Sequence, residues 1–274
     1  MVLKPWQSFP LLLAGCYLVF CLTVILWQRR LLYFPQPLTP AAADAAFALY
    51  GVERWPEGSG AAYRGLVKKT SAAHAFTNGT VLVFHGNAGG AHDRLDYCLT
   101  LQRFGWRVIL AEYPGYGARG GRINEASLRE DACATARLAR QQEPGRLIVF
   151  GESLGCGVAA AVASDPELRV DALVLATPWD KLESVAAARY PWLPVRFFLR
   201  DRYDSAAALA AYSGPVTILM AGDDEIIPAR STLRLYEAMR HALPRRLIRI
   251  PDVGHNDWFD ILTDAQWREI LSPP

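Results

Sequence analysis

One strand–turn–helix segment restricts the possible folds of this chain more than any other. An unbroken apolar run at residues 147–150 predicts a buried strand, the motif Gly-x-Ser-x-Gly follows at residues 151–155, and an Ala-rich run at residues 158–163 predicts a helix. Such a sharp turn strains the backbone of its central residue, and glycines on either side remove Cβ atoms that would clash. The turn therefore offers two groups at one place: the Ser153 hydroxyl as a nucleophile and the Leu154 N–H as an oxyanion donor.

Apolar runs alternate with helical patterns on both sides of this segment. We expect strands at residues 63–69, 80–84, 107–111, 170–177, 216–221 and 246–250, and helices at residues 93–104, 124–142, 231–241 and 263–271. Most of these strands are apolar without polar alternation, which predicts an α/β fold with a largely parallel sheet and helices on both faces. Ligands of such sheets bind at the carboxyl ends of the strands.

The longest irregular stretch of the expected domain is residues 178–213. It carries six aromatic side chains: Trp179, Tyr190, Trp192, Phe197, Phe198 and Tyr203. These aromatics either cover a site or pack against the flank of the sheet. The length of the stretch allows a small cap at most.

A serine hydroxyl needs a base before it becomes a good nucleophile. His255 follows the last expected strand by a short loop, so it lies at the carboxyl edge. The other histidines either lie elsewhere or have another expected role. A third group must orient the imidazole. Asp223 and Asp224 both follow the strand at residues 216–221; Asp224 is our choice and Asp223 the reserve.

A second oxyanion donor is expected from the loop after the strand at residues 80–84. That loop is His-Gly-Asn-Ala-Gly-Gly, residues 85–90, and its glycines let backbone N–H groups face an incoming oxygen. The Asn87 N–H is the expected donor. His85 is then a structural residue that holds the loop, and not the base.

Composition excludes several other classes of function. The net charge is +2 and no Lys/Arg block occurs, so we expect no nucleic-acid partner. The five cysteines show no C-x-x-C spacing, which favours buried thiols over a zinc site or a disulfide framework. The acidic run at residues 223–225 has no histidine or further acid spaced to complete a metal site. We therefore expect no metal and no cofactor.

Residues 9–27 contain no charged side chain and predict a single transmembrane helix. As a helix this run is about 28 Å long, close to the ~30 Å hydrocarbon core of a bilayer. A cleaved signal peptide would have a shorter apolar core, and the lipoprotein-like exit at Cys16 is followed by a stretch as apolar as the one before it. We expect an anchor at residues 1–30, a linker at 31–60 and a catalytic domain at 61–274.

The orientation of this helix is left open. Lys4 lies on one side and Arg29 and Arg30 on the other, so the charge bias is nearly balanced. The sequence thus predicts a membrane protein without predicting the side on which the domain lies.

Five motifs in this chain resemble those of the α/β-hydrolase superfamily, particularly its N-terminally membrane-anchored serine hydrolases. They lie at residues 85–89, 112–117, 151–155, 224–228 and 254–255. The order serine, acid, histidine along the chain is also that of α/β-hydrolases. The resemblance implies an eight-stranded, mostly parallel sheet, a Ser-Asp-His triad with the acid at Asp224, and esterase or thioesterase activity.

Two positions depart from the family pattern. The family commonly has Asp-Tyr-Arg-Gly where this chain has Glu-Tyr-Pro-Gly at residues 112–115, and Gly-Gly where it has Gly155-Cys156. Neither departure removes a catalytic group. The first leaves the shape of the loop at residues 112–117 open, and Cys156 is expected to fill space between helix and sheet.

The resulting hypothesis is a membrane-anchored serine hydrolase that uses Ser153, His255 and Asp224, with Leu154 and Asn87 as oxyanion donors. Its substrate would be a small-molecule or lipid-like ester or thioester. An amidase or peptidase with the same triad is one alternative. A non-catalytic binding protein that keeps the fold is another. A membrane scaffold whose domain has no specific chemistry is a third.

Overall fold

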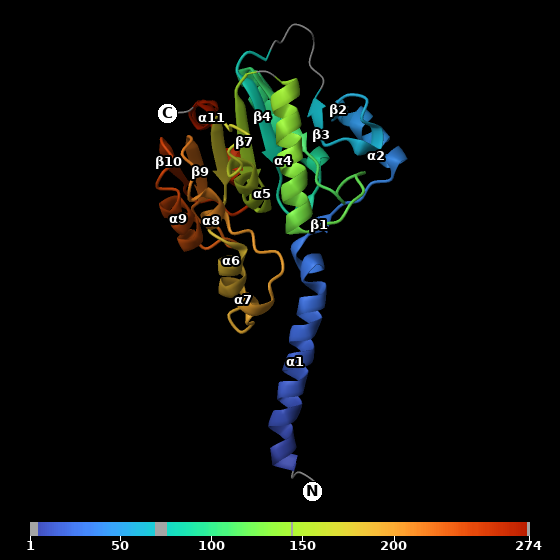
Figure 1. The fold of residues 1–274 in the computed structure, drawn as a ribbon, viewed down its shortest axis with the longest axis vertical. Helices are drawn as coiled ribbons and strands as arrows, with labels where there is room; N and C mark the ends of the chain where they lie inside the picture. The colour runs from blue at the N-terminus through green and yellow to red at the C-terminus, as the bar shows by residue number, and fades with distance from the viewer. Residues whose placement is uncertain (1–4, 69–75, 144, 273–274) are drawn as a thin grey trace.

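An eight-stranded sheet forms the centre of the computed structural model, which describes residues 5–68, 76–143 and 145–272 (Figure 1). The spatial order is β10-β9-β8-β7-β4-β6-β3-β2. The strands are β2 (Val52–Trp55), β3 (Gly65–Lys68), β4 (Gly79–Phe84), β6 (Trp106–Ala111), β7 (Leu147–Glu152), β8 (Ala172–Ala176), β9 (Val216–Ala221) and β10 (Arg245–Ile250). The pairs β2–β3 and β3–β6 are antiparallel and the other pairs are parallel. The expected mostly parallel α/β sheet of eight strands is confirmed.

Helices cover both faces of this sheet. One face carries α4 (Glu125–Gln142), α5 (Leu154–Ala163), α8 (Ser205–Leu209) and α9 (Ala229–Ala238); the other carries α3 (Leu95–Leu101), α10 (Trp258–Ile261) and α11 (Asp264–Leu271). Because side chains alternate along a strand, neighbours enter different cores. Val149 packs in the cluster under α4 and α5, whereas Phe150 packs with Trp258 and Trp267 on the opposite face.

A single long helix, α1 (Pro5–Leu32), projects from the carboxyl-edge side of the domain (Figure 1). Its segment Phe9–Leu32 has a mean hydropathy of 2.5 and is only 6% buried, so it is long and apolar enough to cross a membrane. The helix forms where the sequence predicts one.

The segment at residues 31–60 differs from the expected linker. It contains β1 (Phe34–Pro35), α2 (Pro40–Tyr50) and β2, which is the edge strand of the main sheet. Thr39 caps the start of α2 and Gly51, at φ 63°, ends it in the left-handed region. Phe47 of α2 is buried with the domain core. The segment is therefore part of the folded α/β domain, because its short elements complete one edge of the sheet.

The stretch at residues 178–213 is more regular than expected. It forms α6 (Leu182–Arg189), α7 (Val195–Phe198) and α8, with loops between them. Helices α6 and α7 lie beside the upper part of α1 (Figure 1). The stretch, called the cap below, is no larger than the small cap that the sequence allows, and its short helices lack the long apolar periodicity by which helices are recognised in a sequence.

Candidate active site

Ser153 stands at a strained turn between β7 and α5. Its φ is 51° and its ψ is −115°, a combination that non-glycine residues rarely adopt. A Cβ on Gly151 would lie 2.6 Å from the Gly155 oxygen, and a Cβ on Gly155 would overlap the Phe84 carbonyl. Only glycine fits at both positions, so the Gly-x-Ser-x-Gly spacing is required by the close approach of α5 to β4 and β7.

A line of hydrogen bonds joins three side chains at the carboxyl edge of the sheet. His255 Nε2 lies 2.8 Å from Ser153 Oγ, and His255 Nδ1 lies 2.8 Å from Asp224 Oδ2. His255 is 4% exposed, and the Asp224 side chain is 7% exposed. The structure thus brings together the serine, histidine and acid that the sequence singled out, from the ends of β7, β10 and β9.

The acidic run after β9 separates into three different roles. Asp224 Oδ1 accepts the backbone N–H groups of Ile226 and Ile227, at 2.9 and 2.7 Å, which fixes the carboxylate against the imidazole. Glu225 Oε2 accepts the backbone N–H of His255 at 3.1 Å. Asp223 is exposed. The three carboxylates do not converge on one point, and the geometry favours Asp224 over the reserve Asp223 as the partner of His255.

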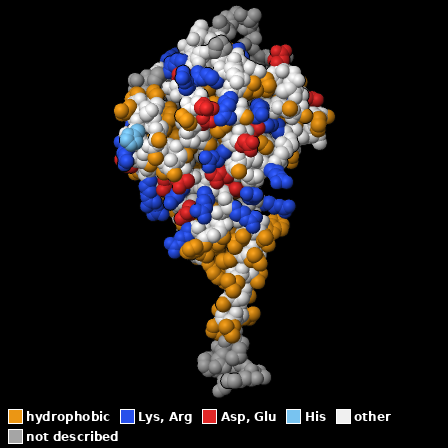
Figure 2. Space-filling view, in the orientation of Figure 1, with side chains coloured by type: hydrophobic (Ala, Val, Ile, Leu, Met, Phe, Trp, Pro, Cys, Tyr) orange, Lys and Arg blue, Asp and Glu red, His pale blue; other side chains and the backbone are white. Residues whose placement is uncertain are grey.

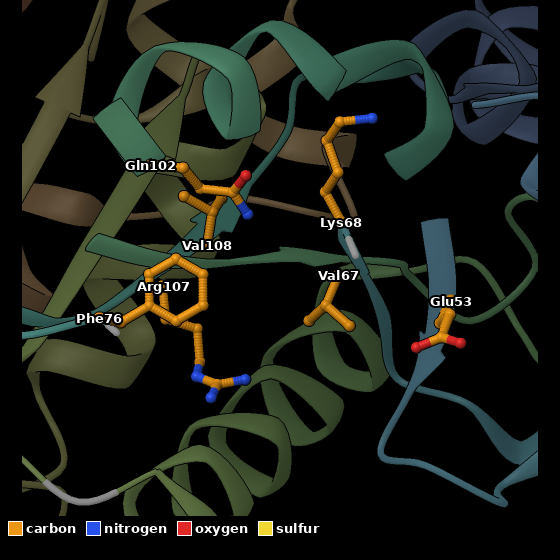
Figure 3. A pocket seen from close by; sticks show the side chains of 7 residues that line it. All are labelled: Glu53, Val67, Lys68, Phe76, Gln102, Arg107 and Val108. Atoms are coloured by element: carbon orange, nitrogen blue, oxygen red, sulfur yellow. The ribbon is translucent and has the colours of Figure 1, made fainter. Parts of the chain in front are cut away.

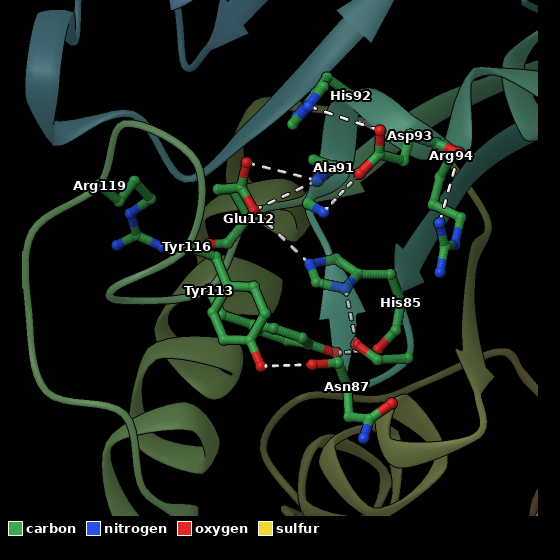
Figure 4. Close-up of polar contacts among 12 residues, drawn as sticks. His85, Asn87, Ala91, His92, Asp93, Arg94, Glu112, Tyr113, Tyr116 and Arg119 are labelled. Carbon is green, nitrogen blue, oxygen red and sulfur yellow. Dashed lines mark hydrogen bonds and ion pairs between the residues drawn. The ribbon is translucent and has the colours of Figure 1, made fainter. Parts of the chain in front are cut away.

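The loop after β4 lies beside the Ser153 side chain. A Cβ on Gly86 would be 3.7 Å from Ser153 Cβ. His85 Nδ1 lies 2.8 Å from the Gly86 oxygen and His85 Nε2 lies 3.5 Å from Glu112 Oε1, so this buried ring is occupied by its own loop and by a carboxylate (Figure 4). These contacts favour the predicted structural role of His85.

The same histidine orients the Asn87 amide. The Gly86 carbonyl and the Asn87 N–H belong to one peptide group, and in a trans peptide they point in opposite directions. With the carbonyl turned toward His85, the N–H is directed away from that ring. The Leu154 N–H is the first of α5 and has no acceptor inside the helix. These are the two backbone donors predicted for the oxyanion.

Asn87 is held from two directions that the sequence does not indicate. Its side-chain Nδ2 donates to the Leu32 oxygen at 2.7 Å, and its carbonyl accepts the Phe34 N–H at 2.9 Å. The same carbonyl accepts the Tyr116 hydroxyl at 2.8 Å (Figure 4). Leu32 ends α1, and β1 pairs in parallel with β5 (Ala88–Gly89) in the loop. The end of the N-terminal helix is therefore built into the wall of the site.

The loop at residues 112–117 supports the same wall. Glu112 is 1% exposed and both of its carboxylate oxygens accept the Ala91 N–H, at 3.2 and 3.3 Å. The Tyr113 hydroxyl donates to the His85 oxygen at 2.7 Å, and burial raises the pKa of Tyr113 well above its usual value, so it stays a donor. Glutamate in place of the family's aspartate thus still meets the loop through its longer side chain.

Charged and aromatic side chains line a cavity of about 240 Å³ beside the residues that flank Ser153 and His255 in sequence. Glu152 in this cavity accepts from Arg94 Nε at 3.2 Å and from the Tyr97 hydroxyl at 3.0 Å. Asn256 also lines this cavity.

Cys156, below the turn, is 1% exposed, and burial raises the pKa of its thiol well above the usual value. It fills space, as expected, and remains a neutral thiol.

Another cavity lies at the amino edge of the sheet, away from the triad. Its volume is about 380 Å³, and it is lined by Glu53, Val67, Lys68, Phe76, Gln102, Arg107 and Val108 (Figure 3). Arg107 and Val108 lie near the start of β6, whose opposite end leads to Glu112. Because this cavity is at the wrong end of the strands, it does not contribute to the site around Ser153.

Comparison with known sequences agrees with this architecture. A profile of the alpha/beta hydrolase fold matches residues 79–207. An uncharacterised protein of Mycobacterium tuberculosis, Rv2307c, is 34% identical over 94% of this chain and 91% of its own length. Lysophosphatidylserine lipase ABHD12 of Danio rerio is 30% identical over 57% of this chain and 46% of its own. The bem46 protein of Schizosaccharomyces pombe is 26% identical over 71% and 69%.

Solved structures share the fold at low sequence identity. The Pyrococcus furiosus esterase PF2001 covers 88% of this chain and 97% of its own, with a TM-score of 0.61 and 16% identity. The Paleococcus ferrophilus monoacylglycerol lipase covers 71% and 95%, with a TM-score of 0.55 and 16% identity. The strand order, the strained serine turn and these sequence matches lead to one conclusion: the chain belongs to the α/β-hydrolase superfamily and has a general hydrolase architecture.

Proposed function

We propose that the protein is a membrane-anchored serine hydrolase that cleaves a carboxylic ester or thioester through an acyl-enzyme. The observation that carries the proposal is the continuous line Ser153–His255–Asp224, with both contacts of the imidazole at 2.8 Å. A serine and a histidine within hydrogen-bond distance, with the histidine oriented by a third group, form the arrangement that nucleophilic catalysis requires.

The geometry supports the following sequence of steps. With its proton on Nδ1 facing Asp224, His255 can accept the Ser153 proton at Nε2 while Ser153 Oγ attacks the carbonyl carbon. The Leu154 and Asn87 N–H groups bind the resulting oxyanion, and each well-aimed donor contributes about 3–4 kcal/mol. His255 then protonates the leaving group, and water activated by the same imidazole releases the acid.

The membrane part of the proposal rests on α1. Phe9–Leu32 is long and apolar enough to span a bilayer, and its faces are almost entirely exposed in the isolated chain. An exposed helix of this hydropathy would aggregate in water, whereas a bilayer would cover it. The full-length chain should resist extraction from membranes by alkaline carbonate, and a chain that lacks residues 1–28 should be extracted; a deletion variant that still resists extraction would show that α1 is not the spanning element.

Labelling with a fluorophosphonate probe tests the enzyme directly. The wild type should react covalently, and Ser153→Ala should lose the label while circular dichroism shows an intact fold. Ser164→Ala is the matched control, because Ser164 stands at the other end of α5 and is exposed. A wild type that takes no label, or a Ser153→Ala variant that keeps it, would remove the basis for the proposal.

Specificity for amides needs polar groups that grip the substrate near the cap. Of the charged residues in the stretch 178–213, Asp201 is 3% exposed and is occupied by Arg29 and Tyr33. Asp201 is therefore not free to bind an amide substrate, and the ester or thioester remains the proposed class. Turnover of a p-nitrophenyl ester series and an acyl-thioester series, compared with the matching anilides, measures the preference.

A further inference from the structure

The cap contacts α1 along about half the length of that helix. The Tyr17 hydroxyl donates to the Trp192 oxygen at 2.7 Å, and the Phe20 and Trp192 rings lie 5.3 Å apart. Further along α1, an apolar cluster joins both segments: Cys21, Val24, Leu193, Val195 and Phe198. This part of the contact consists mostly of apolar side chains.

The contact becomes polar toward the end of α1. Gln28 Nε2 donates to the Phe198 oxygen at 3.3 Å, and Gln28 Oε1 accepts the Arg200 N–H at 2.8 Å. Arg29 then forms a bidentate pair with Asp201, at 2.9 and 3.1 Å. Both segments therefore change from apolar to polar at the same level, just after Trp27.

This level matches the boundary of a hydrocarbon layer. The uncharged run at residues 9–27 is about 28 Å long as a helix, which fills the ~30 Å apolar core. Tyr17 lies about 15 Å before Trp27 along the helix axis. When α1 spans a bilayer, the part of the cap that touches Tyr17 and Phe20 must therefore lie at the depth of the acyl chains.

The outer surface of this part of the cap suits that depth. Tyr190 is 47% exposed, Trp192 54% and Phe197 72%, and they continue the apolar surface of α1. Figure 2 shows hydrophobic side chains gathered where the domain meets the stalk, with a band of basic side chains directly above them. Exposed aromatic side chains are stabilised when an apolar medium covers them, and arginines attract anionic headgroups.

We propose that the outward surface of residues 190–198, here called the cap face, enters the same bilayer leaflet as the adjoining half of α1. The partner of this surface is lipid, because the cap face is continuous with the span and is bordered by exposed Arg189 and Arg200. Arg196 lies within the range and is exposed, and its long side chain can extend to the headgroups. The protein then contacts the membrane through two elements, a spanning helix and an inserted cap.

This placement fixes the depth of the candidate site. Asn87 is hydrogen-bonded to Leu32, which lies about 8 Å beyond Trp27 along α1. The headgroup layer on each side of a bilayer is about 5–8 Å thick, so Asn87 and the neighbouring Ser153 lie at headgroup level. Resting on the proposed function, the inference names the substrate class: an acyl lipid of this leaflet, which reaches Ser153 without leaving the membrane.

Membrane depth can be measured without any activity. Phe197 and Leu243 are equally exposed, at 72% and 70%, and Leu243 lies in the loop between α9 and β10. A nitroxide would be attached to Phe197→Cys or Leu243→Cys in the full-length chain, with Cys16 and Cys133 replaced by serine. In phosphatidylcholine–phosphatidylglycerol vesicles, the label at 197 should be reached by oxygen and protected from a water-soluble nickel complex. The label at 243 should show the opposite.

Two results would overturn the inserted cap. Equal access of the nickel complex to both labels would place the cap face in water. Protection of the label at 197 from oxygen as well as nickel, together with spin–spin broadening between chains, would show that a second copy covers this face instead of lipid.

Activity provides a separate test of the substrate class. Phe197→Asp places a charge in the leaflet and should lower hydrolysis of a diacylglycerol presented in vesicles about tenfold, since a charge at membrane depth costs more than 1.4 kcal/mol. Hydrolysis of a short water-soluble p-nitrophenyl ester should not change, and Leu243→Asp should change neither. If Phe197→Asp loses both activities, or keeps both, the inference is contradicted. Turnover of the soluble ester by the wild type tests the proposed hydrolase separately.

Discussion

The two sides of the candidate site are held in different ways. On the triad side, Asp224 and His255 follow the neighbouring parallel strands β9 and β10, and each is fixed by groups of the same two loops. On the oxyanion side, Asn87 is fixed by Tyr116 and by the end of α1 at Leu32. One side depends on local loop chemistry, and the other depends on contacts between distant segments.

This difference shows what the N-terminal helix contributes besides the proposed attachment to a membrane. Arg29 pairs with Asp201, whose Oδ1 also accepts the Glu125 N–H at 3.2 Å, so the last turn of α1 is tied to both the cap and α4. Tyr33 is buried between Asp201 and Tyr203, with its hydroxyl 3.2 and 3.0 Å from their oxygens. The junction is therefore tied to the domain by several polar contacts, and the bond from Asn87 to the Leu32 oxygen connects it to the loop after β4.

The largest expected effect lies on the triad side. Asp224→Asn keeps the size of the side chain and removes the charge that selects the His255 tautomer, so kcat should fall by about 10⁴-fold. Asp223→Asn changes a neighbouring, exposed carboxylate and should leave kcat unchanged. Steady-state hydrolysis of a p-nitrophenyl ester measures both. A larger loss in Asp223→Asn than in Asp224→Asn would exchange the roles of the two residues.

The triad side could be predicted because short motifs determine it. Ser153 and Asp224 follow buried strands, His255 follows the half-buried edge strand β10, and parallel strands end at one edge. Strand β9 coincides with the predicted residues 216–221, and β10 begins one residue earlier than predicted. Between Asp223 and Asp224, spacing alone allowed both, and the backbone N–H groups of Ile226 and Ile227 distinguish them.

The oxyanion side could be predicted only in part. The glycine-rich loop identified Asn87, but nothing in the chain pattern pairs β1, a two-residue strand, with Ala88 and Gly89. Strand β2 was missed for a similar reason: it has four residues, and Glu53 and Arg54 interrupt its apolar character. Such elements form because the completed sheet edge stabilises them, so their local sequence carries little signal.

A smaller effect is expected for the bond between the loop and α1. Asn87→Ala keeps the backbone N–H but removes the side-chain donor to the Leu32 oxygen, which should loosen the oxyanion donor and lower kcat about tenfold, with KM unchanged. Asn78→Ala is the control, because Asn78 Nδ2 donates to the Phe104 oxygen at 2.6 Å at the opposite end of β4. Similar kcat values for both variants would show that α1 does not position the loop.

The smallest effect distinguishes positioning from stability. Tyr116→Phe removes the hydroxyl bond to the Asn87 oxygen, and Tyr212→Phe removes an equivalent bond to the Pro215 oxygen at 3.1 Å, remote from the site. Each should lower the free energy of unfolding by about 1 kcal/mol, the usual contribution of one hydrogen bond. Only Tyr116→Phe should also lower kcat, by about threefold, because the Phe34 N–H still holds the Asn87 carbonyl. Urea denaturation and ester turnover on both variants separate the two quantities, and an equal loss of kcat in Tyr212→Phe would assign the effect to general destabilisation.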